Sequence, residues 1–268
     1  MTLIWEWLAR LGRPCYGTLE GLGNFFRFSQ QTFYWVFRSP WRLDRLSKEL
    51  ETIGLKSIFI IFLVALFAGM VFALQTGSSF RIFGAETLVG ATVGIALTRE
   101  LAPVFTALMV IARAGSAMAA EIGTMRVTEQ VDALRAMAVH PINYLVVPKV
   151  LASTIMVPLL TILFNGIGML GAYLVAVHLL QIPEGPYLER YRYFVDPEDI
   201  YMGVIKAFIF GILLSLVACY KGYQTRYGAE GVGRATTEAV VLGSVLILVT
   251  DYFLATWLLE IFPDYPYQ

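Results

Sequence analysis

The sequence predicts an all-α protein that crosses a lipid bilayer several times, and three observations support this fold class. Hydrophobic residues make up 57% of the 268 residues, whereas charged residues make up only 15%. A typical soluble domain is about 25% charged. The mean hydropathy is +0.67. Five long apolar segments follow one another without room for a separate soluble domain, so we expect residues 1–268 to form a single membrane domain.

Residues 1–50 are predicted to form an amphipathic region that lies in the membrane interface. Aromatic rings tend to settle at the level of the lipid headgroups, and basic side chains lie near the lipid phosphates. An ordinary cytoplasmic extension is the alternative. The rings are Trp5, Trp7, Phe25, Phe26, Phe28, Phe33, Tyr34, Trp35, Phe37 and Trp41, and the arginines are Arg10, Arg13, Arg27, Arg38, Arg42 and Arg45.

Five segments are long and apolar enough to cross the membrane, which takes roughly 20 residues. The third is too long for a straight crossing, because at 1.5 Å per residue it extends on the order of 55 Å. It must tilt, project beyond the membrane, or kink at Pro148 or Pro158. The transmembrane region as a whole covers residues 57–259, and its five segments are residues 57–76, 87–112, 144–180, 200–220 and 237–259.

The distribution of basic residues predicts a cytoplasmic N-terminus and a C-terminus on the outer side. Loops on the cytoplasmic side of a membrane are rich in lysine and arginine. With this orientation the acidic residues gather in the outer loops, which contain Glu184, Glu189, Asp196, Glu198 and Asp199 beside Arg81, Arg190 and Arg192. The cytoplasmic loops then contain Arg113, Arg126, Arg135, Lys221, Arg226 and Arg234.

The segment between the second and third spans is predicted to contain an amphipathic cytoplasmic helix, at residues 118–138. At 100° per residue, polar and apolar side chains separate onto two faces. The periodicity alone favours a plain surface helix over one that docks a partner. The polar face would carry Glu121, Thr128, Asp132 and Arg135, and the apolar face Val127, Val131, Leu134 and Ala138.

Four charged residues fall inside the predicted spans. Arg99 and Glu100 are adjacent in the second span, where side chains of neighbouring residues point about 100° apart, so each needs a partner elsewhere. One alternative is that both form buried pairs across a dimer. Lys206 and Asp251 lie in consecutive spans at matching depths, roughly 9–12 Å from the outer surface. They are candidates for an ion pair, whether stabilising or functional.

Several patterns that would indicate other functions are absent or weak. The glycine-rich segment at residues 228–235 ends in Gly233-Arg234-Ala235 where a phosphate-binding loop needs Gly-Lys-Ser/Thr. His140 and His178 are predicted at opposite membrane faces, so we expect no shared metal site. No motif for a catalytic nucleophile is present. Cys15 and Cys219 are expected to be unpaired thiols.

The weak motif Gly90-x-x-x-Gly94 permits close helix packing. Its partner helix could belong to the same chain or to a second copy.

The stretch RELAPVFTALMVIARAGSAMAAEIGTMRVTEQVDAL closely resembles the signature region of the MlaE/YrbE permease family. Further matches follow in order: AVHPINYLVVPK, NGIGMLG, GVGRATTEAVV and the region around Asp251. Members of this family are membrane subunits of ABC transporters that move lipids together with MCE proteins. The resemblance extends from the aromatic N-terminal helix to the last span.

The resemblance implies a homodimeric permease in the bacterial inner membrane, with no cofactor of its own and no catalytic residues. Its partners would be an ABC ATPase on the cytoplasmic side, an MCE-domain protein on the periplasmic side and a small STAS-type cytoplasmic subunit. It would move phospholipid or a related lipid between the membrane and the MCE protein. The expected lipid-pathway residues are Arg99, Glu100, Gln75, Phe83, Lys206 and Asp251.

The resemblance also reverses the interpretation of the amphipathic segment, which becomes a coupling helix for the ATPase. The residues implied for coupling are Glu121, Gly123, Arg126, Glu129 and Asp132. Two other functions stay open at this point. One is a membrane scaffold that anchors an ATPase and an MCE ring without transporting, and the other is an intramembrane lipid enzyme with residues that converge from distant spans.

Overall fold

The computed structural model describes residues 2–38 and 42–261, with side chains described from residue 19 onward. Within these ranges the chain is helical and contains no β-strand. Five helical segments are long and apolar enough to span a membrane. The predicted fold class, an all-α polytopic membrane protein, is therefore confirmed. Trp5, Trp7, Arg10, Arg13, Cys15 and Trp41 lie outside the described side chains.

Each span is built from one or more consecutive helical segments. The first two occupy residues 43–81 and 86–127, the third 142–179, and the last two 197–223 and 228–261. The elements are α1 (Thr2–Val36), α2 (Leu43–Ile53), η1 (Leu55–Ser57), α3 (Ile58–Arg81), η2 (Glu86–Leu88), α4 (Val89–Ala96), η3 (Leu97–Leu101), α5 (Ala102–Val110), η4 (Ile111–Gly115), α6 (Ser116–Val127), α7 (Gln130–Ala136), η5 (Ile142–Val146), α8 (Val147–Tyr173), η6 (Leu174–Leu179), α9 (Glu184–Phe194), α10 (Pro197–Tyr223) and α11 (Gly228–Ile261).

Two of the π-helical segments precede a proline and have a simple cause. Proline has no N–H to donate to the carbonyl four residues earlier, and its ring crowds that carbonyl. Pro103 follows η3 and Pro148 follows η5, so the helix widens at the position of the missing bond. At Pro158 α8 continues as an α-helix. The long third span is thus one continuous helical segment, with a π-helical stretch before Pro148 and a second one, η6, at its far end.

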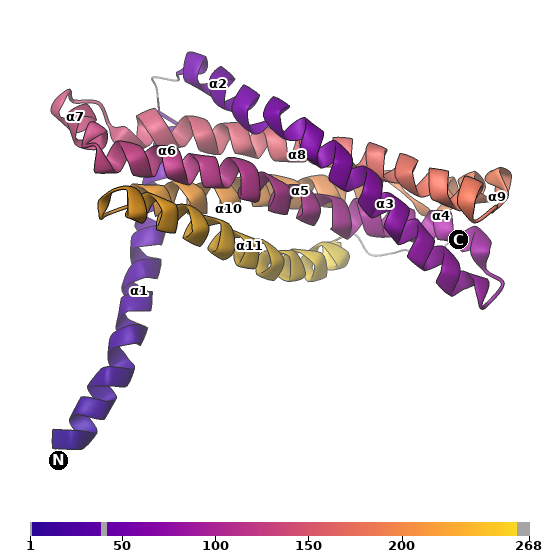
Figure 1. Cartoon of the computed structure of the whole chain (residues 1–268), viewed down its shortest axis with the longest axis horizontal. Helices are drawn as coiled ribbons and strands as arrows, with labels where there is room; N and C mark the ends of the chain where they lie inside the picture. The colour runs from indigo at the N-terminus through magenta and orange to yellow at the C-terminus, as the bar shows by residue number, and fades with distance from the viewer. Residues whose placement is uncertain (1, 39–41, 262–268) are drawn as a thin grey trace.

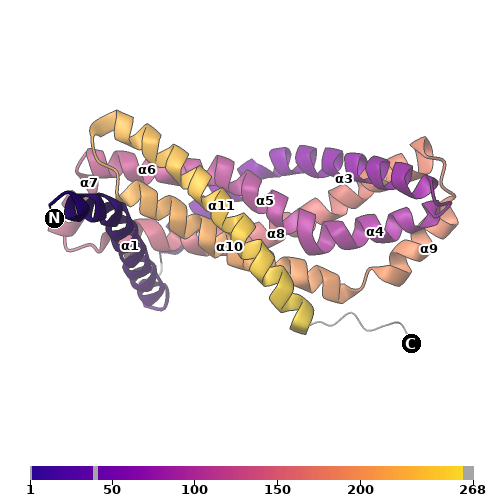
Figure 2. The same cartoon turned by 90° about the horizontal axis from the view of Figure 1, so that it is seen from below.

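The centre of the bundle is α10, which packs on α8, α6 and α11. Within its most apolar stretch 67% of the residues are buried, against 17% for α11. In Figure 2, α11 crosses the face of the bundle diagonally. The spans α3 and α8 cross very closely, because a Cβ on Gly69 would overlap the carbonyl oxygen of Gly168. Such close approach requires glycine.

The short helix α9 covers the Gly90/Gly94 face of α4. A Cβ on Gly90 would lie 2.8 Å from the carbonyl oxygen of Tyr187, and one on Gly94 would lie 2.9 Å from the Tyr191 ring. The motif therefore packs within the chain, which decides between the two alternatives for its partner. Burial raises the pKa of the Tyr187 phenol to about 12, so this side chain is a neutral packing group at physiological pH.

The N-terminal helix α1 projects from the bundle and lies across its long axis (Figure 1). Its C-terminal half is anchored by aromatic contacts to the end of α10. The ring centroids of Phe25 and Phe28 lie 5.2 and 5.5 Å from that of Tyr220. The Tyr220 hydroxyl donates a hydrogen bond to the carbonyl of Gly21 at 3.0 Å. The placement of this helix in the membrane interface stays a prediction.

Candidate functional site

The adjacent charges Arg99 and Glu100 lie in the π-helical segment η3, in the interior of the second span. The missing hydrogen bond before Pro103 lets the helix widen there, and such bulges frequently occur at functional sites. As expected from the sequence, the two side chains find partners on other helices. They do so within one chain.

Arg99 pairs with Asp199, a residue that the sequence analysis placed in an outer loop. The Arg99 Nε lies 2.5 Å from Asp199 Oδ1. Asp199 is in the first turn of α10, where it forms a capping box with Asp196, and its side chain is only 1% exposed. The spacing Asp196-Pro197-x-Asp199 is a recognisable helix start. That spacing could have placed Asp199 on a helix, but its partner depends on how the helices pack.

Glu100, Lys206 and Asp251 form a three-helix ion cluster. The Lys206 ammonium, 1% exposed, pairs with the carboxylate of Glu100 and lies 3.1 Å from Asp251 Oδ1. The structure therefore shows that the candidate pair of Lys206 and Asp251 forms, and Glu100 joins it from η3. Each helix contributes a single charge, so the cluster ties the second, fourth and fifth spans together.

Together these two groups form what we call the intramembrane charge cluster: Arg99, Glu100, Asp199, Lys206 and Asp251. It contains three carboxylates and two cations. The Glu100 side chain is 43% exposed, whereas those of Lys206 and Asp199 are almost completely buried. The cluster thus has an accessible edge at Glu100, where a polar group from outside the chain could interact. A fully enclosed structural pair would lack such an edge.

Gln75 and Phe83, the other two expected lipid-pathway residues, come from the first span and from the turn that follows it. Gln75 is exposed on α3. Phe83 lies in the turn after α3 and is 80% exposed. Their place in a lipid pathway stays a prediction.

The predicted coupling helix at residues 118–138 is interrupted. The helix α6 continues directly from the second span and ends at Val127, and the short α7 begins at Gln130. Between them Glu129 adopts a left-handed conformation with φ of 60°, which a continuous right-handed helix does not allow. The prediction of one helix with a continuous polar face was therefore wrong, because a single residue in the left-handed region turns the chain.

Ion pairs and ring contacts hold this helix–turn–helix segment in place. Arg126 Nη1 donates to both oxygens of Asp132, at 2.9 and 3.0 Å. Arg135 donates to Asp132 at 3.1 Å and to the Tyr223 hydroxyl of α10 at 2.6 Å. Two of the expected coupling residues, Arg126 and Asp132, therefore stabilise the turn. Glu129 lies between them, exposed at its tip.

The other two expected coupling residues face the bundle. A Cβ on Gly123 would lie 2.8 Å from Thr225 Oγ1, so this glycine lets α6 approach the end of α10. Glu121 Oε2 lies 2.6 Å from Lys149 Nζ of α8. Glu49 Oε1 of α2 also lies 2.6 Å from this nitrogen. Lys149 thus connects α6 to α2. The sequence analysis missed this connection because nothing in the chain marks Glu49 as a partner.

Two hydrogen bonds from Arg113 strengthen the contact between α2 and the second span. Arg113 Nη1 donates to the Thr52 carbonyl at 3.0 Å and to Ser57 Oγ at 2.8 Å. Polar contacts as well as packing therefore link the second span to α2 and to the residue before α3.

Comparison with known proteins identifies the family. The family model described as Permease MlaE matches residues 46–257, which is most of the chain. The chain belongs to the MlaE permease family. Every element of the intramembrane charge cluster and of the α6–α7 turn lies inside the matched range. This MlaE-family protein is therefore a polytopic membrane permease.

Individual relatives agree with this assignment. A Rickettsia bellii protein described as a probable ABC transporter permease is 41% identical over 91% of this chain and 94% of its own. A Haemophilus influenzae protein, described as the MlaE permease of an intermembrane phospholipid transport system, is 40% identical over 78% and 80%. The chloroplastic protein trigalactosyldiacylglycerol 1 of Arabidopsis thaliana is 37% identical over 80% and 61%.

Proposed function

We propose that this chain is the permease subunit of an ABC transporter that moves phospholipid or a related lipid between the bacterial inner membrane and a periplasmic MCE protein. The observation that carries the proposal is the intramembrane charge cluster with its accessible edge at Glu100, in a chain related to a phospholipid transport permease. Charges at this depth are costly, and in membrane proteins they commonly mark a substrate pathway.

The transport cavity would lie between two copies of the chain. The support is that α11 is the least buried of the five spans, with 17% of its most apolar stretch buried in a single copy, and that Val245, Val249 and Phe253 on it are at least half exposed. A second copy against this face would bring two charge clusters toward a shared space. Lipid would enter it near Arg99, Glu100, Gln75 and Phe83.

Energy would come from an ABC ATPase that docks on the α6–α7 turn. Glu129 at the tip is exposed and is free of the contacts that hold Arg126 and Asp132. The basic side chains near this turn support its cytoplasmic location, with the N-terminus on the same side and the C-terminus in the periplasm. A STAS-type subunit on the cytoplasmic side completes the proposed assembly. Differential lipid access in two states of the dimer would then produce transport.

The proposal is tested by reconstituting the permease with its ATPase and MCE partners in vesicles and following ATP-dependent transfer of a fluorescent phospholipid. Glu100→Gln should strongly reduce transfer, because it removes the accessible charge while keeping the side-chain size. Arg81→Gln, which removes one partner of an exposed pair with Glu86, is the matched control and should transfer normally. ATP hydrolysis in the wild type without any lipid transfer would indicate a scaffold.

The coupling surface is tested separately through Glu129. Glu129→Arg should abolish copurification of the ATPase while leaving the permease folded, because the Glu129 side chain forms no hydrogen bond or ion pair with the residues that the structure describes. Glu189→Arg on α9, also exposed but at the opposite end of the bundle, should copurify the ATPase normally. If both variants retain the ATPase fully, the α6–α7 turn is not its docking site.

A further inference from the structure

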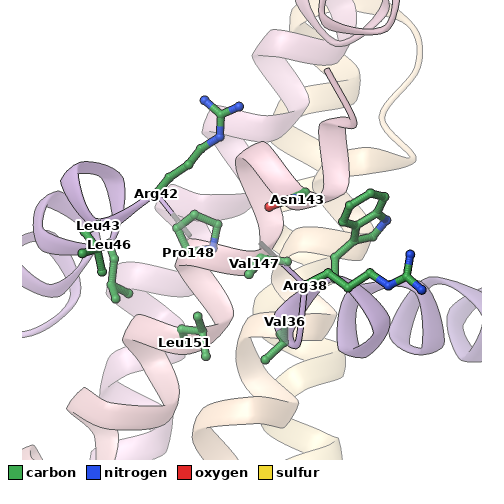
Figure 3. Close-up of a pocket in the computed structure, with 10 residues that line it drawn as sticks. Val36, Arg38, Arg42, Leu43, Leu46, Asn143, Val147, Pro148 and Leu151 are labelled. Carbon is green, nitrogen blue, oxygen red and sulfur yellow. The ribbon is translucent and has the colours of Figure 1, made fainter. Parts of the chain in front are cut away.

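A narrow cleft lies where α1, α2 and the start of α8 meet, at the end of the bundle that also carries α6 and α7 (Figure 1). Apolar side chains form its wall, and Figure 3 shows Leu43 and Leu46 from α2 facing Val147, Pro148 and Leu151 from α8. Arg42 is at the rim, and its guanidinium extends beyond the apolar wall. The cleft is therefore apolar inside and cationic at its edge.

Aromatic rings hold the arginines of this cleft. The guanidinium carbons of Arg42 and Arg45 lie 4.4 and 3.6 Å from the centroid of the Tyr144 ring. Arg45 also donates to the Tyr144 hydroxyl at 2.5 Å. At the other end of the rim, the Arg38 guanidinium carbon lies 4.3 Å from the centroid of the Tyr34 ring. The rings fix the positions of three cations without neutralising them.

These cations have no acidic partner in the part of the chain that the structure describes. The ion pairs there involve other basic residues, and the nearby Glu49 is bound to Lys149. A guanidinium stacked on a ring uses its face and leaves its in-plane N–H groups free to donate. Arg42 and Arg45 also repel each other, because they share one ring. An anion at the rim would relieve this repulsion and accept the free hydrogen bonds.

We propose that this cleft binds an anionic phospholipid that remains with the protein. Its phosphate would accept hydrogen bonds from Arg42 and Arg45, which share the Tyr144 ring, since guanidinium groups match phosphate geometry. Arg38 at the other end of the rim would add to the attraction for the negative charge. One acyl chain would lie against Leu46, Val147 and Leu151. Basic pockets between membrane helices at the level of the headgroups are typical sites for acidic lipids.

The bound lipid would join the interfacial helix α1 to α2 and α8. Residues 38 and 42 follow α1 and precede α2, while Tyr144 lies in η5 immediately before α8. The lipid would therefore set the position of α1 relative to the bundle. This site is separate from the intramembrane charge cluster and requires only that the protein lies in a membrane, so it does not depend on the proposed transport function.

Native mass spectrometry of the purified, delipidated full-length protein tests the proposal. Phosphatidylglycerol should bind about tenfold more tightly than phosphatidylcholine with the same acyl chains, as expected for charge-assisted hydrogen bonds. The double variant Arg42→Ala/Arg45→Ala should lose this preference. Arg27→Ala is the matched control, since Arg27 is exposed on α1 away from the cleft, and it should retain the preference.

A second variant guards against misfolding, because Arg45 contributes a hydrogen bond to the fold. Arg38→Ala removes only a ring contact and should weaken phosphatidylglycerol binding about threefold or more. Equal affinity of the wild type for both lipids would overturn the proposal. The proposal would also be overturned if Arg27→Ala lost as much of the preference for phosphatidylglycerol as the double variant does. That result would show that the positive charge of the whole region, and not this cleft, attracts the lipid. If inorganic phosphate bound as tightly as phosphatidylglycerol, the apolar wall would contribute nothing to binding, and the site would not be a lipid site.

Discussion

Replacing Lys206 with methionine isolates the energetic role of the intramembrane charge cluster. Methionine is similar in length to lysine and apolar, so the substitution removes the ammonium with little change in packing volume. It leaves Glu100 and Asp251 facing each other without the cation that both contact. The fourth span would then carry no charge at the depth of residue 206, and the carboxylates of Glu100 and Asp251 would remain beside it.

The size of the effect follows from the burial of the three groups. Removing one partner of a buried ion pair typically costs 3–5 kcal/mol, because the other charge remains buried and unpaired. Glu100 is 43% exposed, and one carboxylate can be neutralised by a proton, so we expect the lower end, about 3 kcal/mol. Asp251→Asn keeps the pair between Lys206 and Glu100 and should cost only about 1–2 kcal/mol.

The measurement is the free energy of unfolding of the detergent-solubilised protein, obtained by titration with dodecyl sulfate and followed by circular dichroism. The triple variant Lys206→Met/Glu100→Gln/Asp251→Asn provides the decisive comparison. With all three charges removed, it should be more stable than Lys206→Met alone. If the triple variant is no more stable, or if Lys206→Met costs no more than Asp251→Asn, the cation does not hold the cluster together.

Two further predictions concern packing and the cytoplasmic end of the bundle. Gly69→Ala should destabilise the protein by about 1–3 kcal/mol, because the added methyl forces α3 away from α8. Gly166→Ala, on the same α8 but with open space around its Cβ, should be neutral or slightly stabilising. Lys149→Met should cost more stability than Glu49→Gln in the same unfolding titration, because the lysine supports two carboxylates. Equal losses in either comparison would contradict the packing or the ion-pair argument concerned.

Much of the candidate site was predictable because depth in a membrane can be estimated from sequence position. Counting residues from the ends of the last two spans placed Lys206 and Asp251 at matching depths and made them candidates for an ion pair, and the structure shows the pair. The directions of adjacent helical side chains required separate partners for Arg99 and Glu100. The identities of those partners were not predictable, because Asp199 looks like a loop residue until the start of α10 is known.

The coupling segment shows where periodicity fails. Its pattern of polar and apolar residues fits one helix, yet the chain turns at Glu129. Of the four predicted apolar residues, Val131 and Leu134 are nevertheless buried, whereas Val127 is half-buried and Ala138, which follows α7 with a φ of 56°, is exposed. Burial of an apolar face is a local property that survives the break. The backbone conformation of a single residue depends on the contacts that Arg126, Asp132 and Tyr223 make around it.

The sequence by itself determined that this protein is a membrane protein with five spans, because apolar length and composition dictate insertion into the bilayer. It also determined the family, through an ordered series of motifs, and the presence of charges that need partners. Only the tertiary structure decided which helices meet. It showed that Asp199 forms an ion pair with Arg99 and that Glu100 pairs with Lys206. It also showed that Glu49 and Glu121 both pair with Lys149. Inside a membrane all spans are similarly apolar, so the choice of neighbours rests on glycine contacts and ion pairs between residues far apart in the chain.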